Sequence, residues 1–522
     1  MRKLIELTRK QSLRRGAVML ALLLVLAITQ GRAQSTQGSI GGAVTDTAGA
    51  VVPGAMVTLT STEEGTVRTT KSNGVGDYHF EDVKAGHYSL DVTAASFEKW
   101  NATGVALEVR QELRLDVKLQ IGAVTQEVKV TGDNVSAIET DSPTISGTFT
   151  TDDANSLPVN TRASFNGTSA AGIFSALPGV QADGDSSGVS LQGALPYQVD
   201  VTIDGITVKS STGGTYIPDA FPSTESISEI RADGVMANAE FGDPGQIVVT
   251  TKGGTNKLHG SGFWYYQDNK WNAIPYTYPT TVTKPLAHGA TFGGSIGGPV
   301  AIPHLYNGHN KSFFFGTYEG WRFPNQQTLS EVVPSTLMMQ GDFSNYVEPT
   351  KNGGNSFTGL SDPYTGGSFG TSIPSGSLSQ IALDTLKQFY PASGPNVGDP
   401  TAYTDNGVPN WQENVDASRH SDQFDVRGDQ YFGSNQKFLV WGKFTWKNFP
   451  VNSPEILEVP SQTDTNQNRV LKIDTNWSIK PNLINEGGFG FTRVTNGSTD
   501  SFNGNAWTTG EGWQGLDRKS VV

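Results

Sequence analysis

Residues 437–447, Lys437-Phe-Leu-Val-Trp-Gly-Lys-Phe-Thr-Trp-Lys447, alternate between bulky apolar and charged side chains. Successive side chains of an extended strand point to opposite faces. One face therefore carries Phe438, Val440, Phe444 and Trp446, and the other carries Lys437, Lys443 and Lys447. This pattern is typical of a membrane β-barrel, whose apolar face meets lipid while its polar face meets the lumen. Leu439 and Trp441 fall on the lysine face, so the alternation is imperfect.

The same alternation recurs nearby in the chain. From Leu471 to Ile479, four apolar residues oppose Lys472, Asp474, Asn476 and Ser478. Residues 312–322 and 487–494 are further aromatic and glycine-rich runs of strand length. We therefore expect an antiparallel membrane β-barrel beyond Lys257. Periodicity alone also fits a soluble β-sandwich or a surface lectin.

Composition favours a β protein of several domains. The 522 residues exceed one ordinary compact core, which predicts about two to four domains. With 61 glycines, 10% aromatic residues and only 17% charged residues, the chain suits a turn-rich β fold. The chain has no cysteine, which excludes disulfides, zinc fingers and iron–sulfur clusters.

The N-terminus resembles a secretory signal peptide. Six basic residues precede an apolar run from Ala17 to Ile28, and Gly31-Arg32-Ala33 places small residues where signal peptidase cleaves. We expect residues 1–33 to be removed on export. Their loss takes away seven basic residues and one acidic residue, so the formal charge changes from −13 to −19 and nucleic acid is disfavoured as a partner. No later stretch has 18 consecutive apolar residues, so a membrane location would require a barrel.

Residues 34–121 have the short alternating runs and glycine, asparagine and aspartate turns of a small antiparallel sandwich. Their landmarks are Gly38-Ser-Ile-Gly-Gly-Ala-Val-Thr-Asp46, Val52-Pro-Gly-Ala-Met-Val57, Tyr78-His-Phe80, Gly86-His-Tyr88 and Phe97. These landmarks resemble the carboxypeptidase-regulatory-like, transthyretin-like domain. The seven histidines form no His-x-x-Glu pair, so the zinc ligands of a carboxypeptidase are missing.

Residues 122–256 are richer in alanine, serine and aspartate, and their strand-like runs at 127–131, 198–203 and 246–251 are separated by longer polar stretches, which predicts a small α/β domain. The landmarks are Leu157-Pro-Val-Asn-Thr-Arg162, Ala176-Leu-Pro-Gly-Val180, Ile203-Asp-Gly205, Ile227-Ser-Glu-Ile-Arg231, Ala239-Glu-Phe-Gly242 and Gln246-Ile-Val-Val-Thr-Thr-Lys-Gly-Gly-Thr-Asn256. They resemble the plug of TonB-dependent outer-membrane receptors of the Oar-like group.

The expected fold class is therefore mainly β: a transthyretin-like β-sandwich, a small α/β plug domain, and part of a transmembrane antiparallel β-barrel at residues 257–516. The barrel segment has room for about ten strands, against about 22 in a plugged transporter barrel. The last residues, 517–522, resemble a translated sequencing adapter. We accordingly expect the chain to be a C-terminally truncated fragment of a longer protein.

The segment between the first two domains, Glu127, Val128, Lys129, Val130, Thr131 and Gly132, resembles a TonB box. An extended segment can add a strand to the edge of a partner's sheet through main-chain hydrogen bonds. The same residues could equally form the first strand of the plug, and the sequence leaves both interpretations open.

Catalytic motifs are weak. Gly-x-Ser-x-Gly occurs at residues 184–188, 293–297 and 366–370, but none of these has the strand-to-helix context of a nucleophile elbow. We expect no enzyme activity, no cofactor and no metal site.

The resemblance implies TonB-dependent transport of a siderophore, oligosaccharide or peptide across the outer membrane. Partners would be the TonB complex, an extracellular ligand held by loops between about residues 270 and 430, and outer-membrane lipid, with no nucleic acid. The alternative is a surface adhesin or matrix-binding protein of β modules.

Overall fold

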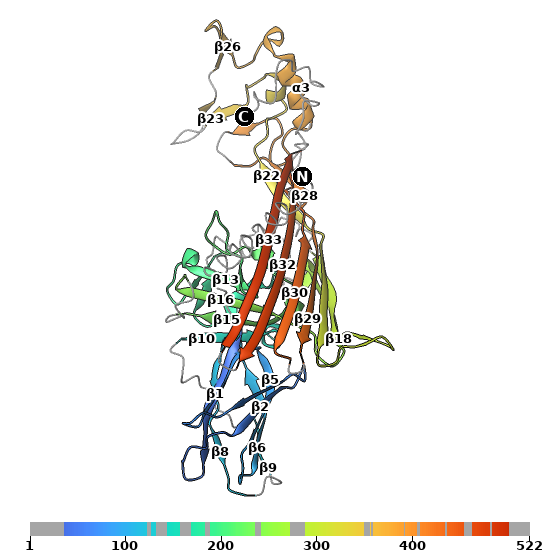
Figure 1. The fold of residues 1–522 in the computed structure, drawn as a ribbon. Helices are drawn as coiled ribbons and strands as arrows, with labels where there is room; N and C mark the ends of the chain where they lie inside the picture. The colour runs from blue at the N-terminus through green and yellow to red at the C-terminus, as the bar shows by residue number, and fades with distance from the viewer. Residues whose placement is uncertain are drawn as a thin grey trace, which may run out of the picture.

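The computed structural model describes residues 36–122, 127–131, 144–156, 169–182, 188–234, 242–271, 288–348, 355–356, 359–390, 392–404, 408–433, 436–453, 462–480 and 483–500. The expected signal peptide and residues 517–522 lie outside these ranges. Three parts follow one another along the chain: an N-terminal sandwich, a middle domain and a large antiparallel sheet with a long insertion (Figure 1). In the described residues, no helix is long and apolar enough to cross a membrane.

The sandwich (residues 36–131) packs two sheets against each other. One has the order β4-β1-β7, with β8 also paired to β1, and the other has the order β3-β2-β5-β6-β9. Alternate residues of each strand point inward, and Ile40, Val57, Leu59 and Leu90 fill the core. The predicted β-sandwich is confirmed. Its strands are β1 (Gly38–Asp46), β2 (Met56–Ser61), β3 (Val67–Lys71), β4 (Asp77–Val83), β5 (Gly86–Thr93), β6 (Lys99–Leu107), β7 (Glu112–Arg114), β8 (Val117–Leu119) and β9 (Glu127–Thr131).

Strand β9 extends the sandwich beyond the expected boundary at residue 121. It runs parallel to β6, from the pair Lys99 and Glu127 to the pair Thr103 and Thr131. The structure therefore places this segment on the sandwich and not in the sheet of the middle domain. A β-prone segment that directly follows a sandwich can pair with the nearest open edge, because edge strands present unpaired backbone groups.

The middle domain (residues 144–251) is built on a five-stranded sheet of order β10-β15-β16-β13-β14, in which β13 and β16 are parallel. The aromatic rings of Phe174, Tyr216 and Phe221 pack edge to face in its core. Its elements are β10 (Ser146–Thr150), α2 (Thr151–Ser156), the 3-10 helix η2 (Ala170–Ala176), β11 (Val180–Ala182), β12 (Val189–Leu191), η3 (Pro196–Gln198), β13 (Val199–Ile203), β14 (Ile206–Thr207), η4 (Pro218–Ala220), η5 (Thr224–Ser226), β15 (Ile227–Asp233) and β16 (Gly245–Thr251).

The large sheet joins long strands that are consecutive along the chain, each antiparallel to the next. In the part of the chain that the structure describes, β17 and β33 are its two outermost strands. Its strands are β17 (His259–Asp268), β18 (His288–Pro299), β21 (Ser312–Phe323), β29 (Arg419–Phe432), β30 (Phe438–Asn448), β31 (Val451–Ser453), β32 (Gln462–Lys480) and β33 (Leu483–Asp500).

The two faces of β30 are those predicted from the alternation. Lys443 and Lys447 are buried on the inner face, toward the middle domain, whereas Phe444 is exposed on the outer face. Leu439 and Trp441 also lie on the inner face and are buried. They break the simple pattern because the inner face is packed against protein and not open to water.

The two ends of the large sheet differ in their connections. At one end β29 joins β30, and β32 joins β33, through short turns, and the sandwich lies at this end (Figure 1). At the other end an insertion of residues 324–418 extends away from the sheet. The insertion contains β22 (Gln326–Glu331), η7 (Met338–Gln340), β23 (Tyr346–Glu348), β24 (Asn355–Ser356), β25 (Leu360–Ser361), β26 (Ser368–Gly370), η8 (Ser375–Ser377), α3 (Gln380–Phe389), β27 (Tyr403–Thr404) and β28 (Trp411–Asp416).

Candidate functional site

The inner face of the large sheet buries an unusual density of polar and charged groups. On β29 every second residue from Ser421 to Asp429 is polar and buried, and β30 and β32 continue the pattern. Such groups are stable in a protein interior only when they are hydrogen-bonded or paired. On these three strands the buried polar residues are Ser421, Gln423, Asp425, Arg427, Asp429, Lys443, Thr445, Lys447, Asn468, Lys472, Asp474 and Asn476.

Asp425 is one point where the middle domain binds this face. Its carboxylate accepts hydrogen bonds from the backbone N–H of Ser223 at 3.0 Å, from Thr317 Oγ1 at 2.9 Å and from Thr445 Oγ1 at 2.6 Å. The Ser223 hydroxyl in turn donates to Glu319 at 2.7 Å. The turn before η5 is thereby fixed to β21, β29 and β30.

Asp204 is a second point, at the tight turn between β13 and β14. Its carboxylate accepts from the N–H and hydroxyl of Thr251, at 2.9 and 2.8 Å, and pairs with Lys443 Nζ at 3.1 Å. Burial works against ionisation of Asp204, but Lys443, Arg427 and the two bonds from Thr251 outweigh it and hold its pKa below the ordinary value. The middle domain thus supplies an anion to the cationic side of β30.

Arg427 forms a third point. Its guanidinium pairs with Asp429 at 2.8 Å, donates to the Thr251 carbonyl at 3.0 Å and lies 4.2 Å from the ring centre of Trp441. A planar guanidinium can bind a carboxylate and stack on an aromatic face at once. This contact with Arg427 explains why Trp441 lies on the polar face of β30.

A fourth contact holds η4 against β30 and β32. The buried Lys447 ammonium lies 3.4 Å from the Asp219 carboxylate and 4.9 Å from the ring centre of Phe449. Asn468 donates to the Asp219 carbonyl at 2.9 Å. The middle domain is therefore held to the large sheet by charged and polar contacts at four places.

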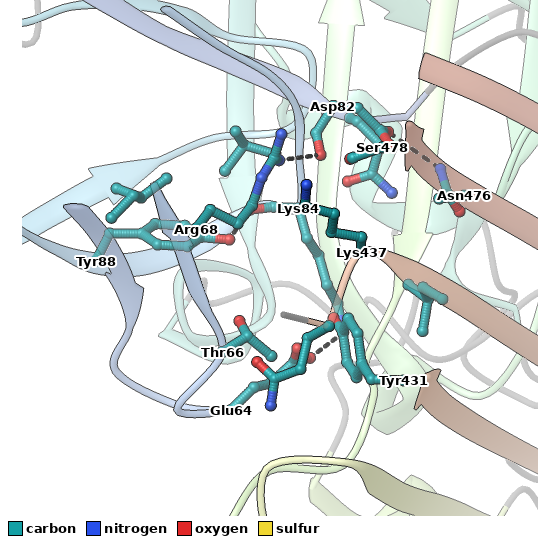
Figure 2. A pocket seen from close by; sticks show the side chains of 15 residues that line it. Glu64, Thr66, Arg68, Asp82, Lys84, Tyr88, Tyr431, Lys437, Asn476 and Ser478 are labelled. Carbon is teal, nitrogen blue, oxygen red and sulfur yellow. Dashed lines mark hydrogen bonds and ion pairs between the residues drawn. The ribbon is translucent and has the colours of Figure 1, made fainter. Parts of the chain in front are cut away.

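The sandwich meets the large sheet through its β2–β3 and β4–β5 turns. Glu64 accepts hydrogen bonds from Lys84 and from the Tyr431 hydroxyl, both at 2.5 Å, and Asn476 donates to Asp82 at 3.0 Å. Figure 2 shows Tyr431 and Asn476 pointing from the large sheet toward Glu64 and Asp82, around a pocket of about 60 Å³. Burial raises the pKa of Asp82, while Arg68 and Asn476 oppose the shift.

A larger cavity of about 300 Å³ lies where all three parts meet. The sandwich contributes Glu64 and Lys84, the middle domain contributes Asp204, and the large sheet contributes Arg427 and Trp441. The four charged groups named here are paired: Glu64 with Lys84, Asp204 with Lys443, and Arg427 with Asp429.

The β6–β7 turn of the sandwich binds the middle domain. The N–H of Val109 donates to both carboxylate oxygens of Glu229 at 3.1 Å. The carbonyl of Val109 accepts a hydrogen bond from Arg231 at 3.1 Å. Arg110 and Arg231 both bind Asp233, at 2.9 and 2.7 Å. Burial raises the pKa of Glu229 from its ordinary 4.5 to about 7.

Residues 250–521 match the outer membrane beta barrel domain family, and residues 39–120 match the carboxypeptidase regulatory-like domain family. The first match covers more than half of the chain. The chain belongs to the outer membrane β-barrel family. The large sheet is thus the barrel wall, and the protein is located in the outer membrane.

Among known proteins, the chain is similar to the TonB-dependent transporter Oar of Myxococcus xanthus, with 23% identity over 286 residues, which cover 53% of this chain and 26% of Oar. The chain therefore spans about a quarter of the length of that relative. In fold it is similar to the outer membrane transporter YddB from Escherichia coli (11% identity, TM-score 0.41, covering 68% of this chain and 40% of YddB) and to the alcaligin outer membrane receptor FauA from Bordetella pertussis (8% identity, TM-score 0.34, 69% and 48%).

Barrel membership sets the orientation of the molecule. Outer-membrane barrels have short periplasmic turns and long extracellular loops. This rule predicts that the sandwich, at the short-turn end, is periplasmic and that the insertion of residues 324–418 is extracellular.

The structure separates the predicted partner-binding segment from the polar interface. Residues 127–131 form β9, the last strand in the order of its sheet, whereas Gly132 lies outside the described residues. Strand β29 was not among the barrel strands predicted from the sequence, although Gln423, Asp425, Arg427 and Asp429 alternate with Phe424, Val426 and Gly428. That period of two was the signal that could have found it.

Catalytic geometry is not evident in the described residues. No group of three or more His, Cys, Asp or Glu side chains there could hold a metal ion. Ser295, in the second Gly-x-Ser-x-Gly motif, lies within β18 and does not precede a helix.

Proposed function

We propose that the protein acts in TonB-dependent transport of a ligand across the outer membrane, with residues 144–251 as the plug of its barrel. The observation that supports this function is the charged interface between the middle domain and the barrel wall. A domain attached by paired ions can leave the wall and let both surfaces be solvated, whereas an apolar contact would expose hydrophobic surface to water.

Energy for such a movement has to arrive by protein contact, because the periplasm and outer membrane offer no nucleotide supply. Strand β9 suits that contact, since it is an edge strand whose outer side ends its sheet among the described residues. Strand addition to such an edge uses main-chain hydrogen bonds and demands little of the sequence. We assign Glu127–Gly132 as the TonB-binding segment on this basis and on its resemblance to a TonB box.

The extracellular insertion is the proposed ligand-binding part. It is joined to the barrel by the paired strands β22 and β28 and carries stacked Tyr346 and Tyr403 rings, 5.5 Å apart. A siderophore, an oligosaccharide and a peptide all remain candidates for the ligand.

The test is binding of the purified periplasmic domain of TonB to the detergent-solubilised chain, measured by biolayer interferometry. Deletion of Glu127–Gly132 is expected to abolish binding, because it removes the strand that receives the partner. Deletion of the turn Asp46–Gly49, which follows β1 in the other sheet of the sandwich, serves as the matched control and should leave binding intact. Equal binding by both deletions would refute the assignment, and an adhesin function would then be favoured.

A further inference from the structure

A small hairpin projects from the periplasmic end of the barrel wall. Strands β19 (Ala301–Ile302) and β20 (Tyr306–Asn307) pair between β18 and β21, and their tip extends away from both the sandwich and the middle domain (Figure 1). Every residue from Ala301 to Asn307 is exposed. The apolar side chains are among them: Leu305 is 80% exposed, Ile302 48% and Tyr306 40%.

The hairpin is a built structure and not a loose loop. Leu305 N–H donates to the Ile302 carbonyl at 3.0 Å, and His304 takes a left-handed conformation with φ of 62° to make the tight turn. The base is fixed as well, since Gly308 N–H donates to the Val300 carbonyl at 3.0 Å and Tyr306 Oη lies 2.5 Å from Ser312 Oγ. Apolar side chains that are held outward in this way indicate a partner surface.

The position of the hairpin along the membrane normal matches the boundary between the apolar layer and the headgroups. Strand β18 has 12 residues. At a rise of about 3.3 Å per residue and a tilt of about 40°, such a strand covers roughly 30 Å along the membrane normal, against an apolar band of about 25 Å. The outer faces of the flanking strands carry exposed Ile296 and Tyr318, so the hairpin continues a lipid-facing surface at the level of the headgroups.

Charge supports a phospholipid surface as the partner. Residues 300–311 contain Lys311, His304 and His309 but no acidic residue, in a chain with a formal charge of −13. A short apolar tip with adjacent basic groups is the combination that binds interfaces with anionic headgroups. Tyrosine is also enriched at the membrane–water boundary.

We propose that the β19–β20 hairpin inserts Ile302, Leu305 and Tyr306 into the headgroup layer of the periplasmic leaflet. The hairpin anchors the barrel wall on the side away from the sandwich, so the sandwich and middle domain can move against a wall whose depth in the membrane is fixed. This anchor is independent of the proposed transport function.

The test uses the cysteine-free chain, reconstituted at full length into phospholipid vesicles. Leu305→Cys carries an environment-sensitive fluorophore, and Val75→Cys, 63% exposed in a turn of the sandwich, is the matched control. In vesicles that contain phosphatidylglycerol, the probe at position 305 should emit further to the blue than the control and lose most of its emission to nitroxide-labelled lipid. Emission equal to that of the control, with quenching only by a water-soluble quencher, would overturn the proposal.

A second variant separates lipid from other partners. Replacing His304, His309 and Lys311 by glutamine should remove the additional quenching seen with phosphatidylglycerol over phosphatidylcholine alone. The quenching seen in phosphatidylcholine should remain, because the apolar tip is unchanged. If the probe is shielded only after a periplasmic extract is added, the surface binds protein and the lipid anchor is wrong.

Discussion

Asp204 shows how single residues hold the middle domain against the barrel wall. The carboxylate accepts three hydrogen bonds, two from Thr251 and one from Lys443, which belongs to the wall and lies 239 positions away along the chain. Breaking a buried pair from one side typically costs about 3–5 kcal/mol, because the remaining charge stays in a poor solvent. Moving the whole domain away costs less, because water can then solvate both partners. The arrangement is therefore sensitive to loss of one partner but compatible with the proposed movement of the whole plug.

Glu229 gives the junction between the sandwich and the middle domain a pH dependence. Its pKa is raised from 4.5 to about 7, so the assembled state favours the protonated carboxyl. That stabilisation is complete below pH 4.5 and is lost as the pH rises through about 7. The shift corresponds to about 3 kcal/mol at most. We expect the free energy of unfolding of the wild type, relative to Glu229→Gln, to fall between pH 4.5 and about pH 7, as measured by urea titration.

The matched control is Glu112→Gln, which changes an exposed carboxylate on β7 of the same sandwich. The difference in free energy of unfolding between Glu112→Gln and the wild type should not vary over the same pH range. If the wild type and Glu229→Gln keep a constant difference, Glu229 does not govern the junction.

At the scale of the strand, the alternation along β30 predicts how the position of a charge decides its effect. Phe444 and Phe438 both lie on the outer face, and each ring contacts another ring, Phe424 at 5.9 Å and Phe432 at 5.8 Å. Phe444 is near the middle of the strand, and Phe438 is at its periplasmic end. A lysine on the lipid face costs about 2–4 kcal/mol at the bilayer midplane and about 0–1 kcal/mol near the interface. We expect Phe444→Lys to destabilise the chain in vesicles by the larger amount, measured by guanidinium unfolding.

Phe438→Lys is the control for the lost ring contact, and it should be tolerated. An equal loss of stability in both variants would mean that ring packing, and not depth in the lipid, sets the cost. It would also contradict the assignment of this face to lipid.

The strand pattern could be predicted from sequence where a residue's own neighbours determine its environment. Lys443 and Phe444 alternate because lumen and lipid alternate, and that information is local. Trp441 could not be placed in the same way, since its partner Arg427 is on another strand and its polar face is closed by a distant domain. The position of β9 depended on an open edge of the sandwich, which no local pattern reveals.

At the scale of the molecule, the sandwich acts as a cap over the periplasmic side of the barrel wall. Its β2–β3 and β4–β5 turns bind the wall, and its β6–β7 turn binds the middle domain, so three turns at one end of the sandwich fix it to both other parts. A ligand that passes the middle domain would next meet the sandwich. Transport by the proposed route therefore requires the sandwich to move as well.

Few side chains attach the cap to the barrel wall, so this attachment can be tested by substitution. Four side chains of the large sheet and its connecting segments hydrogen-bond to the sandwich: Tyr431, Asn476, Gln436 and Asn256. The middle domain holds the β6–β7 turn in addition, through Glu229, Arg231 and Asp233. At about 1 kcal/mol each, the joint loss of the four side chains removes roughly 4 kcal/mol of attachment. We expect the combined variant Tyr431→Phe, Asn476→Ala, Gln436→Ala and Asn256→Ala to leave the sandwich folded but free to shift against the wall, while its β6–β7 turn still binds the middle domain.

Double electron–electron resonance between spin labels at Val75→Cys and Leu483→Cys measures the distance between the sandwich and the wall. Both sites are exposed, and the chain has no other cysteine. The wild type should give one narrow distance distribution and the combined variant a broad one. Alanine at four exposed sandwich positions, Thr69, Lys71, Glu112 and Lys118, should keep the narrow distribution. A combined variant that stays narrow would show that the contacts of the β6–β7 turn with the middle domain, together with backbone contacts such as the bond from Asn256 N–H to the Glu63 carbonyl at 2.9 Å, suffice to hold the cap. The sandwich would then have to be pulled from the wall together with the segment that follows the middle domain.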